Sequence, residues 1–69
     1  MIRNRGLEKS VFTAVTTAPL ASTTEVTRIV NRLGTSVGRA AVRRTLRVLE
    51  DEGQIANIGD GADAWRVSA

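Results

Sequence analysis

The chain has 69 residues, which allows one small domain, and a formal net charge of +3 from ten basic and seven acidic residues. It contains neither cysteine nor histidine, which excludes disulfides, thiolate metal sites and the commonest general base. We therefore expect no metal, no cofactor and no enzymatic activity. Phe12 and Trp65 are its only aromatic residues, so aliphatic residues and alanine must build the small core, which favours packed helices.

The beginning of the chain is basic, but no apolar segment follows it, so it does not have the pattern of a secretory signal. No apolar run approaches the roughly 20 residues that span a bilayer. We predict a flexible basic arm at residues 1–6 and one domain at residues 7–69. The expected protein is soluble and cytoplasmic, makes no membrane contact, and is nucleoid-associated if the host is prokaryotic.

The first periodic segment, residues 7–18, predicts an amphipathic helix. Pro19 ends it, because the residue before a proline disfavours helical geometry. Residues 19–21 then form a short extended connector, in which Leu20 is expected to enter the core. The apolar stripe has steps of three and four residues and consists of Leu7, Val11, Ala14, Val15 and Ala18.

A second helix is predicted after Ser22. Ser22 and Glu25 have the spacing of a capping box, in which each side chain bonds to a backbone amide near the other residue. Gly34 is placed to stop the helix in the left-handed conformation. The apolar face comprises Val26, Ile29, Val30 and Leu33.

A third helix is predicted from about Val37 to Glu52, with Ser36 as its N-cap and Gly53 at its end. Its buried stripe consists of Val42, Leu46 and Leu49. Only a few residues separate the second and third helices, which forces the two into a tight corner.

Beyond Gly53 the pattern changes to a period of two. Residues 54–58 and 64–67 alternate, and the turn-rich residues 59–63 lie between them, which predicts a β-hairpin. Ile55, Trp65 and Val67 are expected to face the helices together. The predicted fold class is thus mainly α with a small β-hairpin (α+β).

Residues 33–55 resemble the helix-turn-helix core of winged-helix DNA-binding regulators. In that superfamily a buried valine, two buried leucines, a glycine and an apolar strand residue recur in one order. The matching residues here are Val42, Leu46, Leu49, Gly53 and Ile55. The resemblance extends over residues 7–67 and is more specific for the fold than for the target. It implies a winged helix-turn-helix domain, with three helices and a C-terminal wing, whose third helix lies in the major groove of double-stranded DNA.

The residues of the third helix favour the same function independently. Three of its arginines are spaced by four, so they form one ridge, and like charges at this spacing repel each other slightly. A polyanion would reverse that repulsion, and release of its counterions would add to the affinity. The arginines are Arg39, Arg43, Arg44 and Arg47. An alternative assigns Arg47 to a surface ion pair with Glu50 or Asp51.

Further candidate DNA contacts surround this helix. Gly38 would allow close approach to the groove, and Thr23 and Thr24 would hold a phosphate at the start of the second helix. The remaining candidates are Ser36 before the third helix, Arg66 on the hairpin, and Arg3 and Arg5 in the N-terminal arm. Because Asp60 and Asp63 would repel phosphate, the wing itself is expected to be mainly structural.

The predicted function is sequence-directed binding of duplex DNA, as in a small transcriptional regulator. Affinity would rise through a homodimer or through side-by-side loading on DNA. The alternative is a winged-helix protein-interaction module of a larger plasmid, phage or replication assembly, using the acidic residues of the late third helix and the wing. The two hypotheses differ in whether salt bridges occupy the arginines. RNA binding is disfavoured, because both aromatic residues are expected to be buried.

Overall fold

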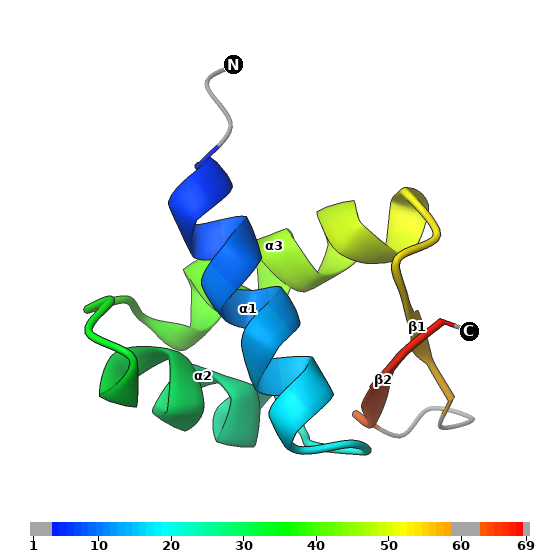
Figure 1. Cartoon of the computed structure of the whole chain (residues 1–69), viewed down its shortest axis with the longest axis horizontal. Helices are drawn as coiled ribbons and strands as arrows, with labels where there is room; N and C mark the ends of the chain where they lie inside the picture. The colour runs from blue at the N-terminus through cyan, green and yellow to red at the C-terminus, as the bar shows by residue number, and fades with distance from the viewer. Residues whose placement is uncertain (1–3, 59–62, 69) are drawn as a thin grey trace.

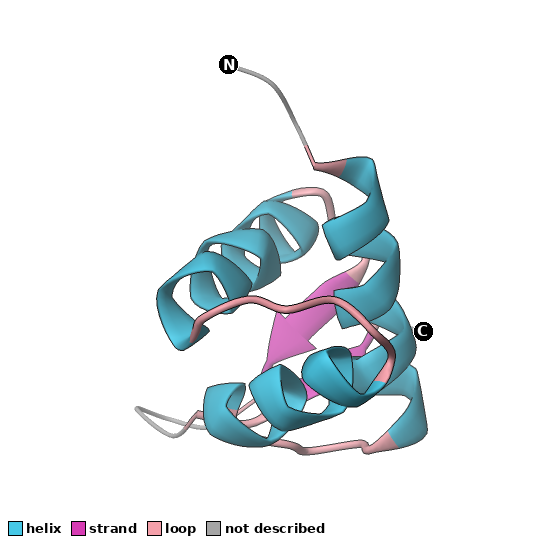
Figure 2. Cartoon of the chain, turned by 90° about the vertical axis from the view of Figure 1, so that its left-hand side faces the viewer, coloured by secondary structure: helices cyan, strands magenta, loops and turns pink. Residues whose placement is uncertain are grey.

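The computed structural model describes residues 4–58 and 63–68. Three helices come first, α1 (Arg5–Thr17), α2 (Thr23–Arg32) and α3 (Arg39–Asp51), and two short strands follow, β1 (Ile55–Asn57) and β2 (Trp65–Val67). The strands pair antiparallel as a C-terminal hairpin beside the helices (Figure 1). Seen from the helical side, the hairpin lies behind the helices (Figure 2). The predicted α+β class and winged-helix layout are confirmed.

Helix α1 begins two residues earlier than predicted. The side chain of Asn4 accepts a hydrogen bond from the Leu7 amide at 2.9 Å, so Asn4 is the N-cap and Arg5 and Gly6 form the first turn. The predicted start of this helix at residue 7 is therefore wrong, because the first apolar residue is not the first helical one and Asn4 supplies the cap.

Helix α2 has the predicted cap and stop. The Ser22 hydroxyl accepts from the Glu25 amide at 3.1 Å, while the Glu25 carboxylate pairs with Arg28 at 3.4 Å instead of returning to the cap. Gly34 has a φ of +100°, in the left-handed region, directly after the C-cap residue Leu33. Leu33, predicted to be part of the apolar face, is 51% exposed.

Helix α3 begins later than predicted. Its N-cap is Gly38, which offers no side-chain hydrogen bond, and the helix starts at Arg39. The predicted start at Val37 and the predicted cap Ser36 are wrong, because the side chain of Asn31 holds the Val37 backbone in the preceding turn. Gly53, with a φ of +76°, follows the C-cap as predicted.

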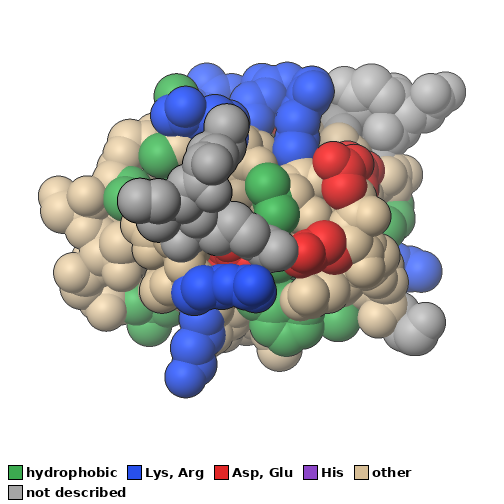
Figure 3. All heavy atoms as spheres, turned by 90° about the horizontal axis from the view of Figure 1, so that it is seen from above, with side chains coloured by type: hydrophobic (Ala, Val, Ile, Leu, Met, Phe, Trp, Pro, Cys, Tyr) green, Lys and Arg blue, Asp and Glu red, His purple; other side chains and the backbone are tan. Residues whose placement is uncertain are grey.

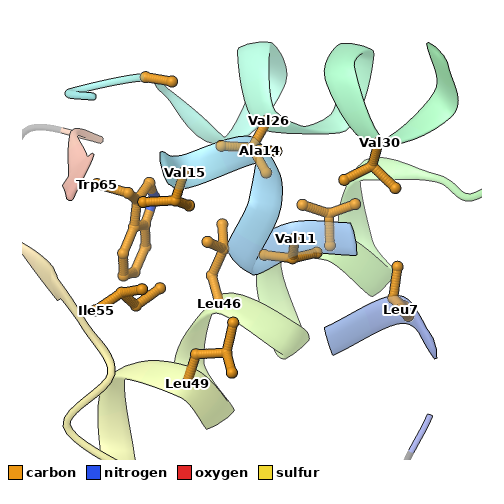
Figure 4. Close-up of a cluster of buried hydrophobic side chains, with 12 residues drawn as sticks. Leu7, Val11, Ala14, Val15, Val26, Val30, Leu46, Leu49, Ile55 and Trp65 are labelled. Carbon is orange, nitrogen blue, oxygen red and sulfur yellow. The ribbon is translucent and has the colours of Figure 1, made fainter. Parts of the chain in front are cut away.

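The core lies where the three helices and the hairpin meet (Figure 4). The predicted stripes of the first and third helices are buried in it except for Ala18, which is partly buried, and Trp65 and Ile55 from the hairpin pack at one end. The buried apolar side chains are Leu7, Val11, Ala14, Val15, Ala21, Val26, Val30, Val42, Leu46, Leu49, Ile55 and Trp65.

The connector between α1 and α2 pairs with β2 through one isolated antiparallel β-bridge, between Ala21 and Trp65. The Leu20 amide donates to the Trp65 carbonyl at 2.8 Å, and the Trp65 amide donates to the Ala21 carbonyl at 3.1 Å. This pairing buries Ala21 and leaves Leu20 56% exposed with a φ of +69°. Leu20 therefore does not enter the core as predicted; its small neighbour does.

The hairpin has a regular register in which Ala56 faces Arg66 and Asn57 faces Trp65. The Ile58 amide continues the pairing to the Ala64 carbonyl at 3.0 Å. Because side chains alternate along a strand, Trp65 is buried while Arg66 is exposed. Within the described residues, no helix is long and apolar enough to cross a membrane.

Candidate nucleic-acid interface

The arginines of α3 form a continuous exposed surface, which we call the arginine face: Arg39, Arg43, Arg44 and Arg47. The same helix is anchored by buried residues at three-to-four-residue steps, so its opposite side is left for the solvent. Figure 3 shows basic side chains gathered along one edge of the molecule, on the side where α3 lies behind α1 in Figure 1, with acidic side chains in separate groups. The fold therefore presents these charges together.

The arginine face has no ion-pair partner within residues 4–58 and 63–68. In particular, the alternative pairing of Arg47 with Glu50 or Asp51 is not formed there. The pair that does form in this part of the chain, between Arg28 and Glu25, lies on α2. Four guanidinium groups thus stand close together with their charges uncompensated by contact, each carrying up to five unused N–H donors.

The N-terminus of α3 adds backbone donors at the same end. Because Gly38 provides no side-chain cap, the first amides of the helix have no partner from that residue. A Cβ built on Gly38 would have no heavy atom within 4 Å, so neither packing nor its φ of −88° requires a glycine there. Ser36, two residues earlier, is exposed. The space beside Gly38 is therefore open.

The N-terminus of α2 is occupied differently from the prediction. Thr23 is 1% exposed, its amide donates to Asp63 Oδ2 at 2.9 Å, and its hydroxyl donates to Asp63 Oδ1 at 2.6 Å. Both groups that were expected to hold a phosphate are thus engaged by a carboxylate of the chain itself. Thr23 is therefore removed from the candidate contacts, whereas its neighbour Thr24 is exposed.

Trp65 completes this arrangement, which we call the Asp63 clasp (Thr23, Asp63 and Trp65). The indole Nε1 donates to Asp63 Oδ1 at 2.9 Å and lies 3.3 Å from the Thr23 hydroxyl. Desolvation raises the pKa of Asp63, but hydrogen bonds from Thr23 and Trp65 and the nearby charge of Arg39 outweigh it, so the pKa lies below the ordinary 3.8. The carboxylate is thus held ionised, as a cap on α2.

Arg66 lies apart from the arginine face. It borders a shallow apolar groove of roughly 400 Å³ between the C-terminal half of α1 and β2, and no residue of α3 lines that groove. Arg5 is exposed in the first turn of α1. Arg3 and Asp60 lie outside the described residues. The structure therefore places the candidate arginines of α3 on one surface and Arg66 on another.

Two polar residues that position these elements escaped the sequence reasoning. The sequence pattern predicts Asp63 to be a repulsive charge at the hairpin tip, and its place two residues before Trp65 is the local signal of its actual role. Asn31 was not singled out, and it bridges α2 to the backbone before α3. Both residues bond across a turn or a long sequence separation, and the hydrophobic periodicity along the chain does not predict such contacts.

We compared the chain with models of known protein families and with curated proteins. No protein-family model matches the chain, and no curated protein is significantly similar to it.

Proposed function

We propose that this chain is a member of the winged helix-turn-helix superfamily that binds double-stranded DNA, with α3 in the major groove, and acts as a small transcriptional regulator. The observation that carries the proposal is the arginine face, exposed and without ion pairs among the described residues. Sequence-directed binding would follow from the arginine fork, which matches the O6 and N7 acceptors of guanine.

The geometry of α3 supports this proposal. An α-helix with its side chains is about 10–12 Å wide, and the major groove of B-DNA is about 12 Å wide. The arginines occupy the first three turns, whereas Glu50 and Asp51 are exposed at the other end. We therefore expect the N-terminal half of α3 to enter the groove. Its acidic C-terminal end should stay out of the groove, away from the phosphates.

The start of α3 supplies complementary donors for the backbone of DNA. Helix amides without a cap, together with the positive end of the helix dipole, favour an anion at this end. Arg39 follows immediately, and Gly38 leaves room for a close approach. In this proposal all four arginines contact phosphates on DNA of any sequence, and at a preferred site Arg43, Arg44 and Arg47 reach the base edges.

The proposed partner defines the remaining expectations. The domain would bind DNA without cofactor or catalysis, in the cytoplasm or nucleoid, and would increase affinity as a homodimer or by side-by-side loading. A single α3 carrying four arginines would neutralise about four phosphates, which predicts an affinity loss of about 100-fold between roughly 50 and 200 mM salt.

A second candidate function is a protein-interaction module. The observation that favours it is the apolar groove bordered by Phe12, Pro19 and Arg66, which lies away from α3. A protein bound at this groove and DNA bound at α3 would occupy different surfaces of the domain.

Fluorescence anisotropy with a labelled mixed-sequence duplex, repeated over a salt series, tests the proposal. Arg43→Ala should weaken binding and reduce the slope of log affinity against log salt by up to about one unit. Lys9→Ala is the matched control, because it removes the same charge from an exposed position on α1. No binding at low salt, or equal losses in the two variants, would refute the proposal.

A further inference from the structure

The turn between α2 and α3 has two parts, and each is held to α2 by different hydrogen bonds. Its first part is fixed by the backbone, since the Gly34 amide donates to the Asn31 carbonyl at 3.1 Å and the Thr35 amide to the Val30 carbonyl at 3.3 Å. The second part, up to Gly38, has no regular structure. Its geometry decides where the first turn of α3 begins.

One side chain spans this second part. Asn31 Nδ2 donates to the Val37 carbonyl at 3.0 Å, and the Val37 amide donates to Asn31 Oδ1 at 3.4 Å. The same Nδ2 also donates to the Thr27 carbonyl at 2.8 Å, which fixes the amide on its own helix. We call this arrangement the Asn31 bridge (Asn31, Thr27 and Val37). Both Nδ2 hydrogens are consumed in it.

The bridge acts on the residue immediately before the N-cap of α3. Gly38 follows Val37, contributes no side-chain cap bond and has no heavy atom near its Cβ position, so its side makes no contact that fixes the chain. Among the described residues, Asn31 is the side chain that hydrogen-bonds to the backbone between 35 and 38. The orientation of Arg39 relative to α2 therefore depends on it.

We infer that Asn31 is a positioning residue for DNA binding: it holds Val37 so that the first turn of α3 enters the groove in a single orientation. This inference rests on the proposed function. Asn31 acts through Val37 and not as a DNA contact, because its donors are already used inside the protein. Flexibility at Val37 would have to be frozen on binding, which weakens the affinity.

Replacing Asn31 should leave the fold intact. The side chain is exposed, and alanine has the higher helix propensity, which offsets part of the lost hydrogen bonding. Asn31→Asp keeps an oxygen toward the Val37 amide but places a second oxygen against the Val37 and Thr27 carbonyls. It should therefore disrupt the bridge at nearly constant size.

The test combines two measurements on the full chain, wild type, Asn31→Ala and Asn31→Asp, with Thr13→Ala at an exposed position of α1 as control. In the free protein, 15N relaxation should show lower order parameters at Val37 and Gly38 in both Asn31 variants. Anisotropy titration with the mixed-sequence duplex should show about fivefold to tenfold weaker binding in both, with the control unchanged.

Weaker binding without increased motion at Val37 would assign Asn31 a direct contact and overturn the inference. Increased motion with unchanged affinity would also overturn it, because the bridge would then not govern binding. If the wild type shows no salt-dependent binding, the proposed function itself fails, whereas the relaxation data still report whether the bridge restrains the turn.

Discussion

Removal of the Asp63 carboxylate should destabilise the whole domain. In Asp63→Ala the Thr23 amide, the Thr23 hydroxyl and the Trp65 indole lose an ionised acceptor at 2.9, 2.6 and 2.9 Å. Thr23 and Trp65 are 1% and 5% exposed, so water replaces that acceptor poorly on their side. The clasp also ties the hairpin to α2 across 40 residues of sequence.

The magnitude follows from these contacts. A buried donor left without its acceptor costs about 1–3 kcal/mol, but Asp63 is itself exposed, and the indole keeps a weaker partner in the Thr23 hydroxyl. We therefore expect a total loss of about 1–3 kcal/mol. This is a large share of the roughly 3–10 kcal/mol expected for a domain of this size. It corresponds to a fall in Tm of about 4–8 °C for each kcal/mol.

Urea unfolding followed by circular dichroism and by the fluorescence of Trp65 measures this loss. Asp51→Ala is the matched control, because Asp51 is an exposed aspartate with no ion pair among the described residues, and it should change stability by less than about 0.5 kcal/mol. Asp63→Asn should be intermediate, since one oxygen can still accept while the new amide group faces a donor. A loss in Asp63→Ala no greater than in Asp51→Ala would refute this account of the clasp.

Two further predictions concern pH and the turn. Because the pKa of Asp63 is lower in the folded than in the unfolded protein, its stabilisation is complete above the ordinary value of 3.8 and is lost as pH falls through the folded value. The free energy of unfolding should therefore fall less steeply with decreasing pH in Asp63→Ala than in the wild type. Identical pH profiles of the two proteins would contradict this role of the Asp63 carboxylate. Gly34→Ala should cost about 1–2 kcal/mol, because φ is +100° there, whereas Gly38→Ala should cost less than about 0.5 kcal/mol in thermal unfolding. Equal losses would show that the left-handed conformation is not the cause.

The clasp also changes the interpretation of the wing. As a free surface charge, Asp63 would repel DNA. In the structure its carboxylate instead lies at the N-terminus of α2, accepts three hydrogen bonds and lies close enough to Arg39 for that charge to lower its pKa. The same carboxylate occupies the donors of Thr23 that an external phosphate would use. The proposed binding of DNA through α3 therefore makes no use of the Thr23 donors.

The sequence by itself determined the order of the elements and most of the core. Signals that act within a few residues were sufficient, because a cap or a left-handed glycine satisfies or ends its own helix. Ser22, Gly34 and Gly53 are examples, and the stripe of Val42, Leu46 and Leu49 follows from helical period alone. The arginine face was predictable for the same reason, since the spacing of its members places them on one helix.

Only the tertiary structure decided the positions where a distant partner outweighs local preference. Pairing with Trp65 buries Ala21 and turns Leu20 outward, and Asn31 holds Val37 out of α3, so the cap moves from Ser36 to Gly38. The clasp joins Thr23 to a carboxylate 40 residues away. Such hydrogen bonds depend on how helices and hairpin pack, which no periodicity along the chain encodes.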